Sequence, residues 1–418
     1  MAIARIDFAR MSGSSSRWGL NPSTVSLLAV ILLIAAGYEL FRPFMPRYIS
    51  KEDLEKNLLY VGLYGTFADL LEGIYYRMGG RIGARLGARR SLVLFCSMPI
   101  VGAAILITWS STLAPFLALP LLQAWDSISA PSTLTVIGET LPPDRRTLAL
   151  SMQSILKRIP RIPAYLVGGA MMKNLGDTMG VHVAAEVFMG LAGLALIVQL
   201  RFLKVEAKDA ATTSAPFLAT LRTFQRDLKV LLASDILIRL GEGFTRVLEV
   251  LYLTSALAVA QRIDPGQYGR YLALNAIVST LIYIPIGLAA SKTGTAKKPY
   301  IGLTFAFFAL FPFAVIVGPE FGTIGLIAAF VVMGLREIGE PARKAMITEL
   351  VSRERKTEET GLYWSARSFA VMIAPALGAL AWLGLGPRAP FVIAGCIGTF
   401  GAVFFYATFG RQAATPAA

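Results

Sequence analysis

A ladder of charged residues runs through the mostly apolar stretch SDILIRLGEGFTRVLEVLYL, which starts at Ser234. Its members are Asp235, Arg239, Glu242, Arg246 and Glu249. The steps between them are four, three, four and three residues, a spacing that places all five on one face of an α-helix. Acids and bases that alternate along one helix face can pair with one another, or they can form a polar track for a solute or a proton.

Charged residues also interrupt other apolar segments. A charge at the centre of a bilayer costs from about 2.5 kcal/mol upward, so charges that persist there usually face a cavity or pair with one another. Such charges, with three members of the ladder, are candidates for contact with a solute or a proton: Glu39, Arg42, Asp126, Glu242, Arg246, Glu249, Arg336, Glu337 and Glu340. Glu39 and Arg42 are three residues apart and can pair within their helix.

Several other charges have a plainer explanation that stays open. Asp69, Glu72, Lys157 and Arg158 are expected near helix ends, where they would reach water or cap a gate. Arg367 can equally well pair with a neighbouring helix or contact a solute.

The elements that must position these charges are membrane-spanning helices. Of the 418 residues, 55% are hydrophobic and 16% are charged, whereas soluble domains have about 25% charged residues. A spanning helix needs about 20 mostly apolar residues. Candidate segments lie near residues 24–46, 56–78, 91–110, 113–139, 147–172, 181–203, 229–258, 268–290, 299–317, 322–347, 359–384 and 389–410. The chain is therefore predicted to be an all-α polytopic membrane protein.

The placement of basic residues predicts which side of the membrane each loop faces. The net charge is +14, but Lys and Arg concentrate in alternate loops, such as 77–90 and 201–229, as the positive-inside rule requires. This pattern puts both termini in the cytoplasm and argues against nucleic-acid binding. Residues 1–23 are polar and lack the apolar core of a signal peptide, so the first helix is expected to direct insertion. The expected location is the inner (plasma) membrane of a bacterium.

Residues that bind metals or perform catalysis are scarce. Cys96 and Cys396 both fall within predicted helices, where packing is expected rather than a disulfide. His182 is the only histidine and has no companion ligand, so no metal site is predicted. Because no nucleophile–base set or phosphate-binding loop occurs, we expect neither an enzyme nor a cofactor.

Two pairs of similar segments indicate an internal duplication. PSTLTVIGETLPPDR, from Pro131, and PARKAMITELVSRER, from Pro341, both read Pro, seven residues, Glu, five residues, Arg, at an offset of 210. GRIGARLGARR, from Gly80, and GLAASKTGTAKK, from Gly287, match at an offset of 207. The predicted organisation is a tail over 1–23, a six-helix bundle over 24–203, a central loop over 204–228, a second bundle over 229–410 and a tail over 411–418. Repeats of this kind characterise transporters whose solute site lies near the midplane.

At this point the chain resembles the major facilitator superfamily over nearly its whole length. The motif of that family between helices two and three is Gly, three residues, Asp, Arg, any residue, Gly and a basic pair. The matching residues are Gly80, Arg85, Gly87, Arg89 and Arg90. Ala88 is inserted before the pair, and Ala84 occupies the Asp position. The motif of drug–proton antiporters is matched only loosely, by Pro163 and Gly168–Gly169.

The resemblance implies two pseudo-symmetric six-helix bundles with a cytoplasmic gate, and a central cavity lined by helices one, four, seven and ten. Because the Asp that helps to close the gate in the family is missing, other carboxylates are expected to take its place. The remaining candidate gate residues are Glu139, Arg145, Asp235, Arg239, Glu349 and Arg355. Asp126 and Arg336 also lie 210 residues apart and are expected to face each other across the pseudo-twofold axis.

Together these features predict a secondary active transporter. It would move a small charged, zwitterionic or amphiphilic solute by alternating access, coupled to protons through a cavity carboxylate whose charged form is disfavoured by burial. Resemblance to efflux members favours export. The alternative on the same fold is a lipid or lysolipid flippase, which a lateral opening of the cavity would favour. The expected partners are the solute, protons and the lipid bilayer, and we expect a monomer.

Overall fold

The computed structural model describes residues 22–140, 155–204, 217–255, 262–291, 297–351 and 356–409. All regular secondary structure in these residues is helical, which confirms the predicted all-α class. Six stretches are long and apolar enough to cross a membrane, judged by length and composition. Two of these stretches, Arg161–Phe202 and Lys298–Leu350, turn back on themselves at Gly176 and at Gly318–Phe321. We refer to each pass of the chain along the bundle as a crossing.

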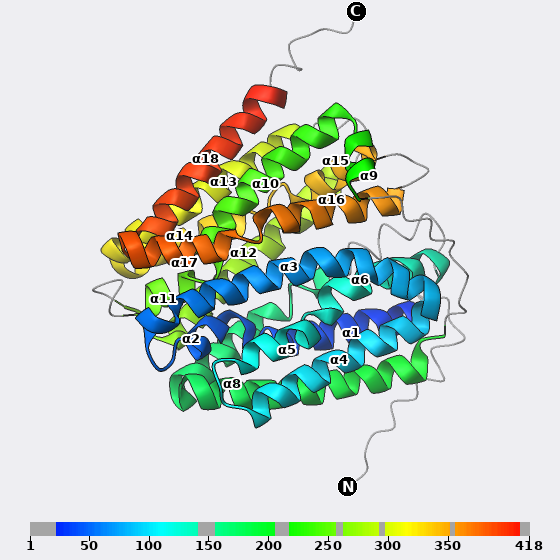
Figure 1. The fold of residues 1–418 in the computed structure, drawn as a ribbon, viewed down its shortest axis with the longest axis horizontal. Helices are drawn as coiled ribbons and strands as arrows, with labels where there is room; N and C mark the ends of the chain where they lie inside the picture. Colours follow the sequence, from blue (N-terminus) through cyan, green and yellow to red (C-terminus); the bar gives the residue numbers. More distant parts are fainter. Residues whose placement is uncertain are drawn as a thin grey trace, which may run out of the picture.

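The first half of the chain forms the lower bundle in Figure 1. Its helices are α1 (Pro22–Tyr38), α2 (Met45–Ile49), α3 (Leu54–Leu86), α4 (Ala88–Thr108), α5 (Ala114–Leu122), α6 (Ala124–Thr140) and α8 (Arg161–Phe202). Helix α8 contains two crossings, because Gly176 adopts φ 77°, a conformation that favours glycine. Helices α1 and α4 both pack along α8.

The second half forms the upper bundle. Its helices are α9 (Phe217–Thr223), α10 (Arg226–Arg246), α11 (Glu249–Thr254), α12 (Pro265–Ser291), α13 (Lys298–Val317), α14 (Gly322–Leu335), α15 (Glu340–Leu350), α16 (Lys356–Val371), α17 (Ala374–Leu385) and α18 (Ala389–Phe409). The short 3-10 helix η3 (Gly318–Phe321) joins α13 to α14.

The first, fourth, seventh and tenth crossings are each interrupted. In the first, α1 ends at Tyr38 and the 3-10 helix η2 (Arg42–Phe44) precedes α2. Gln123 separates α5 from α6, and Val247–Leu248 separates α10 from α11. Arg336–Gly339 separates α14 from α15. These are the crossings that the family resemblance assigns to the cavity, and the eleventh crossing is interrupted as well, at Met372–Ile373 between α16 and α17.

Two glycines allow the interrupted first and seventh crossings to pack closely against their neighbours. A Cβ atom on Gly168 of α8 would lie 2.0 Å from the carbonyl oxygen of Leu40. A Cβ atom on Gly378 of α17 would lie 2.1 Å from the carbonyl oxygen of Phe244. These glycines are 210 residues apart, the offset found between the repeated segments. The same backbone contact therefore occurs in both halves, which supports the duplication.

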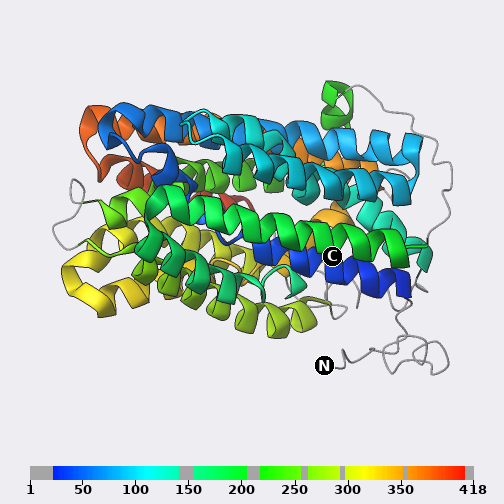
Figure 2. The ribbon, with the colours of Figure 1, turned by 90° about the horizontal axis from the view of Figure 1, so that it is seen from below.

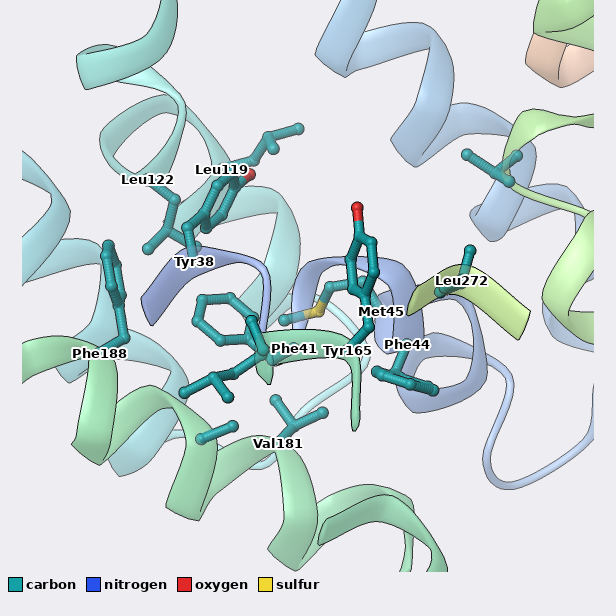
Figure 3. Packing of buried hydrophobic residues seen from close by; sticks show 14 of the residues in the cluster. Tyr38, Phe41, Phe44, Met45, Leu119, Leu122, Tyr165, Val181, Phe188 and Leu272 are labelled. Carbon is teal, nitrogen blue, oxygen red and sulfur yellow. The ribbon is translucent and has the colours of Figure 1, made fainter. Parts of the chain in front are cut away.

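Aromatic residues surround the interruption in the first crossing (Figure 3). Phe41 and Phe44 are fully buried, and the ring of Phe41 lies 5.7 Å from that of Phe188 on α8. Leu272 of α12 belongs to the same cluster. The hydrophobic core therefore continues from the first bundle into the second.

Two seams join the bundles. Helix α3 lies against α16 and α17 (Figure 1), and α8 lies against α12 (Figure 2). A Cβ atom on Gly62 of α3 would lie 2.7 Å from the Cβ atom of Ala379 on α17. A Cβ atom on Gly269 of α12 would lie 2.3 Å from the carbonyl oxygen of Tyr165 on α8. Small residues permit such close helix contacts in membranes, and both seams are closed at these points.

Candidate functional site

A cavity of about 420 Å³ lies between the bundles, a size within the range of about 300–1,000 Å³ typical of small-molecule pockets. Residues of both halves form its wall. The charged residues on the wall are Arg42, Asp69, Glu72, Asp126, Lys157, Arg161, Glu242, Arg246, Glu249 and Arg336. The tyrosines on the wall are Tyr38, Tyr64, Tyr76, Tyr165 and Tyr268. The cavity therefore combines acidic, basic and aromatic groups.

Glu39 lies behind this wall and holds two basic residues. Arg42 donates to the Glu39 carboxylate from Nε at 3.0 Å and from Nη2 at 2.8 Å, so the predicted pair is present. Arg161 of α8 forms a second ion pair with Glu39, at 3.0 Å. One buried carboxylate thus orients two guanidinium groups that line the cavity.

Asp126 and Arg336 both line the cavity, but the expected contact between them is absent from the described residues. Asp126 pairs with Lys157 at 3.4 Å, within the first half. Arg336 lies 3.7 Å from Glu242, and its guanidinium group lies 4.5 Å from the ring centre of Phe311. Each of the two residues has a counter-ion within its own bundle, so neither charge requires a partner across the axis.

The ladder does not lie on one continuous helix, contrary to the expectation from its spacing. Helix α10 ends at Arg246, and α11 begins at Glu249 after the interruption. Before the interruption, Arg239 pairs with Glu242 at 2.7 Å and lies 3.9 Å from Asp235. Arg246 instead donates to Asp69 of α3 at 2.8 Å, across the boundary between bundles. The first part of the ladder is self-paired, and the last part faces other helices.

Asp235 and Glu340 lie in a buried charge cluster within the second bundle, away from the cavity wall. Arg343 hydrogen-bonds to both carboxylates, at 2.7 Å in the case of Glu340. The hydroxyl of Tyr363 donates to Asp235 at 3.2 Å. This cluster joins the seventh, tenth and eleventh crossings. Its charges neutralise one another where water does not reach, so it holds the bundle together.

Two further charges link the bundles outside the cavity wall. Glu337 accepts a hydrogen bond from Arg158 at 2.8 Å, so this predicted cavity residue instead joins the tenth crossing to the segment before α8. Arg367 of α16 lies 3.9 Å from Glu72 and 3.8 Å from Asp235. Of the two expectations for Arg367, pairing with a neighbouring helix is therefore the one that the structure contains.

The candidate gate residues are only partly described. Gly87 separates α3 from α4 and has φ 77°, a backbone conformation that favours glycine because it lacks a Cβ atom. Arg85, Arg89 and Arg90 are exposed, and Arg89 donates to the carbonyl of Leu200 at 3.1 Å. Their gating role stays a prediction.

Other candidate gate residues lie near helix ends. Glu349 pairs with Lys297 at 2.6 Å. Gly80 lies within α3 and Glu139 within α6, but the structure does not describe how these two residues pack. Arg145 and Arg355 lie outside the described residues.

The sequence interpretation missed several wall residues. Asp69, Glu72 and Lys157 were expected near helix ends, and Arg161 was in no candidate set, yet all four line the cavity. The spacing of Asp69 and Glu72 was a usable signal, because residues three apart share a face of α3. Lys157 lies in the turn before α8, which begins at Arg161. The positions of these residues along their crossings were misjudged, and those positions depend on where the helices begin, end and are interrupted.

Three solved transporters have a similar fold. The nucleoside transporter NupG has a TM-score of 0.75 and 14% identity, over 92% of this chain and 99% of its own. The peptide transporter POT in complex with sulfate has a TM-score of 0.74 and 15% identity, over 95% of each chain. The human organic anion transporter MFSD10 (TETRAN) has a TM-score of 0.64 and 16% identity, over 92% of this chain and 99% of its own. A search of curated proteins gave no match.

The family model also matches this sequence directly. The model described as Major Facilitator Superfamily matches residues 27–260 and 231–418. Together with the paired six-helix bundles and the cavity between them, this match identifies an integral membrane transporter rather than an enzyme. The chain belongs to the major facilitator superfamily.

Proposed function

We propose that this protein is a secondary active transporter that moves a small charged, zwitterionic or amphiphilic solute by alternating access, coupled to protons through Glu249. The observation that carries the proposal is the cavity between the halves, whose charged wall contains one carboxylate, Glu249, that forms no ion pair with any described residue. Cytoplasmic termini follow from the placement of the basic residues, and export follows from the family resemblance. Both stay predictions, as does the location in a bacterial inner membrane.

Glu249 differs from the other carboxylates on the wall. Asp69, Asp126 and Glu242 each have an ion-pair partner, at 2.8, 3.4 and 2.7 Å. Glu249 is buried, and within the described part of the chain its hydrogen-bond partner is the hydroxyl of Tyr268, at 3.1 Å. Because a buried charge without a counter-ion is costly, this carboxyl group is suited to taking up a proton and releasing it when the cavity changes.

Ion pairs that cross between the halves support alternating access. Arg246 with Asp69 and Arg158 with Glu337 each join one bundle to the other. If the bundles rotate relative to each other, these pairs must separate or exchange partners. Arg246 lies three residues before Glu249 and lines the same cavity. The ion pair that must separate during bundle movement is therefore close in sequence to the carboxyl group that takes up the proton.

The test uses purified protein in proteoliposomes. Flux is measured for a panel of charged and neutral solutes, with and without an imposed pH gradient. Glu249→Gln is expected to retain solute exchange at equal pH and to lose accumulation driven by the gradient, because the amide cannot carry a proton. The matched control is Glu186→Gln, an exposed carboxyl on α8 that does not line the cavity. Gradient-driven accumulation by Glu249→Gln at the wild-type level would contradict the role of Glu249.

The flippase alternative finds less support. It needs a lateral opening for lipid tails, but small residues bring α3 close to α17 and α8 close to α12. The same proteoliposomes can carry dye-labelled lipids. Lipid flipping without flux of any solute would favour the flippase over the solute transporter.

A further inference from the structure

We infer that the transported solute carries an anionic group, a carboxylate or a phosphate, which binds between Arg42 and Arg246. The inference rests on the proposed transport function and specifies the chemistry of its substrate.

The two arginines occupy equivalent positions in the two halves. Arg42 begins η2 at the interruption of the first crossing, and Arg246 ends α10 at the interruption of the seventh. A glycine precedes each by five residues and packs against the last crossing of the same half. A Cβ atom on Gly37 would lie 2.6 Å from the ring of Phe188, and one on Gly241 would lie 2.8 Å from the carbonyl of Ala394. Arg42 and Arg246 therefore occupy the same position relative to the helix interruption and to the preceding glycine in their two halves.

Both guanidinium groups keep hydrogen-bonding capacity toward the cavity. The Arg42 side chain is 42% exposed and that of Arg246 is 40% exposed. Arg42 uses Nε and Nη2 to bind Glu39, and Arg246 uses Nη2 to bind Asp69. Among the described residues, Nη1 of Arg42 and both Nε and Nη1 of Arg246 have no hydrogen-bond partner. Each arginine thus has one edge anchored and other N–H groups free.

The anchoring carboxylates present little surface to the cavity, although Asp69 is one of its lining residues. The side chains of Glu39 and Asp69 are only 5% and 4% exposed, so a solute meets the guanidinium groups rather than their counter-ions. Lys157 and Arg161 add two more partly exposed cations to the wall. The most exposed carboxylate on the wall, Asp126, is already paired with Lys157. Beside the Lys157–Asp126 pair, the most exposed charged groups on the wall are therefore the guanidinium groups of Arg42, Arg161 and Arg246.

The two arginines also line one cavity, one from each half of the chain. Tyr64 of α3 lines the same cavity as both arginines. A planar guanidinium group binds carboxylate and phosphate through paired, charge-assisted hydrogen bonds. An anion held by one arginine from each bundle would join the halves, as a transported solute must.

Binding in detergent tests the anion site separately from transport. The probes are benzoate, phenyl phosphate, benzamide and benzylamine, added to purified protein at constant ionic strength set with sodium chloride. The measurement is the thermal unfolding midpoint as a function of probe concentration. We expect saturable stabilisation by benzoate or phenyl phosphate, and the stronger of the two tells which anion the site prefers. Benzamide and benzylamine are expected to give none.

Variants separate the anion site from a structural ion pair. Asp69→Asn removes the pair but keeps the arginine, so anion binding is expected to persist. The double variant Asp69→Asn/Arg246→Gln leaves no buried charge unpaired and is expected to weaken binding by about tenfold or more. Arg42→Gln is expected to weaken binding similarly, while Glu39 keeps its pair with Arg161.

Three results of the binding experiments would overturn the inference: equal stabilisation by benzamide or benzylamine, no stabilisation by either anion, or wild-type anion binding in the double variant. Flux in proteoliposomes distinguishes failure of the anion-site inference from failure of the proposed transport function. Anion binding without flux of any solute would count against transport and leave the anion site intact. Flux of cationic or neutral solutes alone would keep transport and reject the anion site.

Discussion

At the residue scale, the second bundle tolerates buried charge because acids and bases are balanced within contact distance. Arg343 is 1% exposed, yet it hydrogen-bonds to Asp235 and Glu340, and its guanidinium group lies 5.0 Å from the ring centre of Trp364. A buried charge is stable only while its partners remain. The cluster therefore makes each member necessary to the others.

Arg343→Met is expected to destabilise the protein by about 3–5 kcal/mol, because it leaves Asp235 and Glu340 buried without their main counter-ion. The measurement is the thermal unfolding midpoint of purified protein in detergent. The matched control is Arg388→Met, which breaks an ion pair with Glu320 in which both side chains are exposed. Exposed pairs contribute about 0–1 kcal/mol. Equal midpoints for the two variants would show that the cluster does not stabilise the bundle.

At the element scale, the interruption of the tenth crossing has a definite cause in the packing of α13. The amide N–H of Gly339 donates to Oγ1 of Thr304 at 2.6 Å, which gives a partner to a backbone group freed by the break. A Cβ atom on Gly339 would lie 2.2 Å from the carbonyl of Tyr300. The turn therefore depends on a hydroxyl and on a residue without a side chain.

Thr304→Val is expected to lower stability by about 1–3 kcal/mol, because it keeps the shape of the side chain but leaves the Gly339 amide without a partner in an apolar surrounding. Thr304→Ser, which keeps the hydroxyl, is expected to retain most of that stability. Thermal unfolding in detergent compares the two. If valine were tolerated better than serine, packing by the methyl group and not the hydrogen bond would be the stabilising contact.

Helix existence was predictable at this scale, but helix continuity was not. Long apolar runs indicate spanning segments whatever their neighbours, because lipid demands internal hydrogen bonding. The interruptions at Gln123 and at Val247–Leu248 carry no proline or glycine of their own. They depend on contacts with neighbouring helices, which the sequence of one segment does not contain. For this reason the ladder was assigned to one straight helix.

At the scale of the whole molecule, transport by alternating access requires the seams between the bundles to open. The seam between α3 and α17 contains the contact of Gly62 with Ala379. Cysteine Cβ atoms at these positions would start 2.7 Å apart, with the one at position 62 also 2.8 Å from the carbonyl oxygen of Pro375. The helices must therefore move apart by about 1 Å to reach the Cβ separation of a disulfide, about 3.5–4.5 Å. The chain has two native cysteines, one buried and one exposed, which are first replaced by alanine or serine.

In that background, Gly62→Cys/Ala379→Cys is expected to lose transport on oxidation and to regain it on reduction, because the disulfide holds the seam closed. The measurement is flux in proteoliposomes, with disulfide formation followed by thiol labelling. Each single cysteine variant is the control and is expected to be insensitive to oxidant. Full flux through a completely cross-linked protein would mean that this seam stays closed during transport.

The sequence by itself determined the fold class, the duplication and the presence of intramembrane charges that include Glu39, Arg42, Arg246 and Glu249. These features depend on hydrophobicity, on spacing and on the cost of burying a charge in lipid. Only the tertiary structure decided which charges face the cavity and which neutralise one another inside a bundle. In the sequence, Glu340 and Arg246 are both charged residues within apolar segments. In the structure, Glu340 is hydrogen-bonded to Arg343, whereas Arg246 keeps N–H groups free toward the cavity. Glu340 has its partner three residues away on α15, but Asp235, Asp69 and Glu337 have theirs on other elements, and only helix packing brings those pairs together.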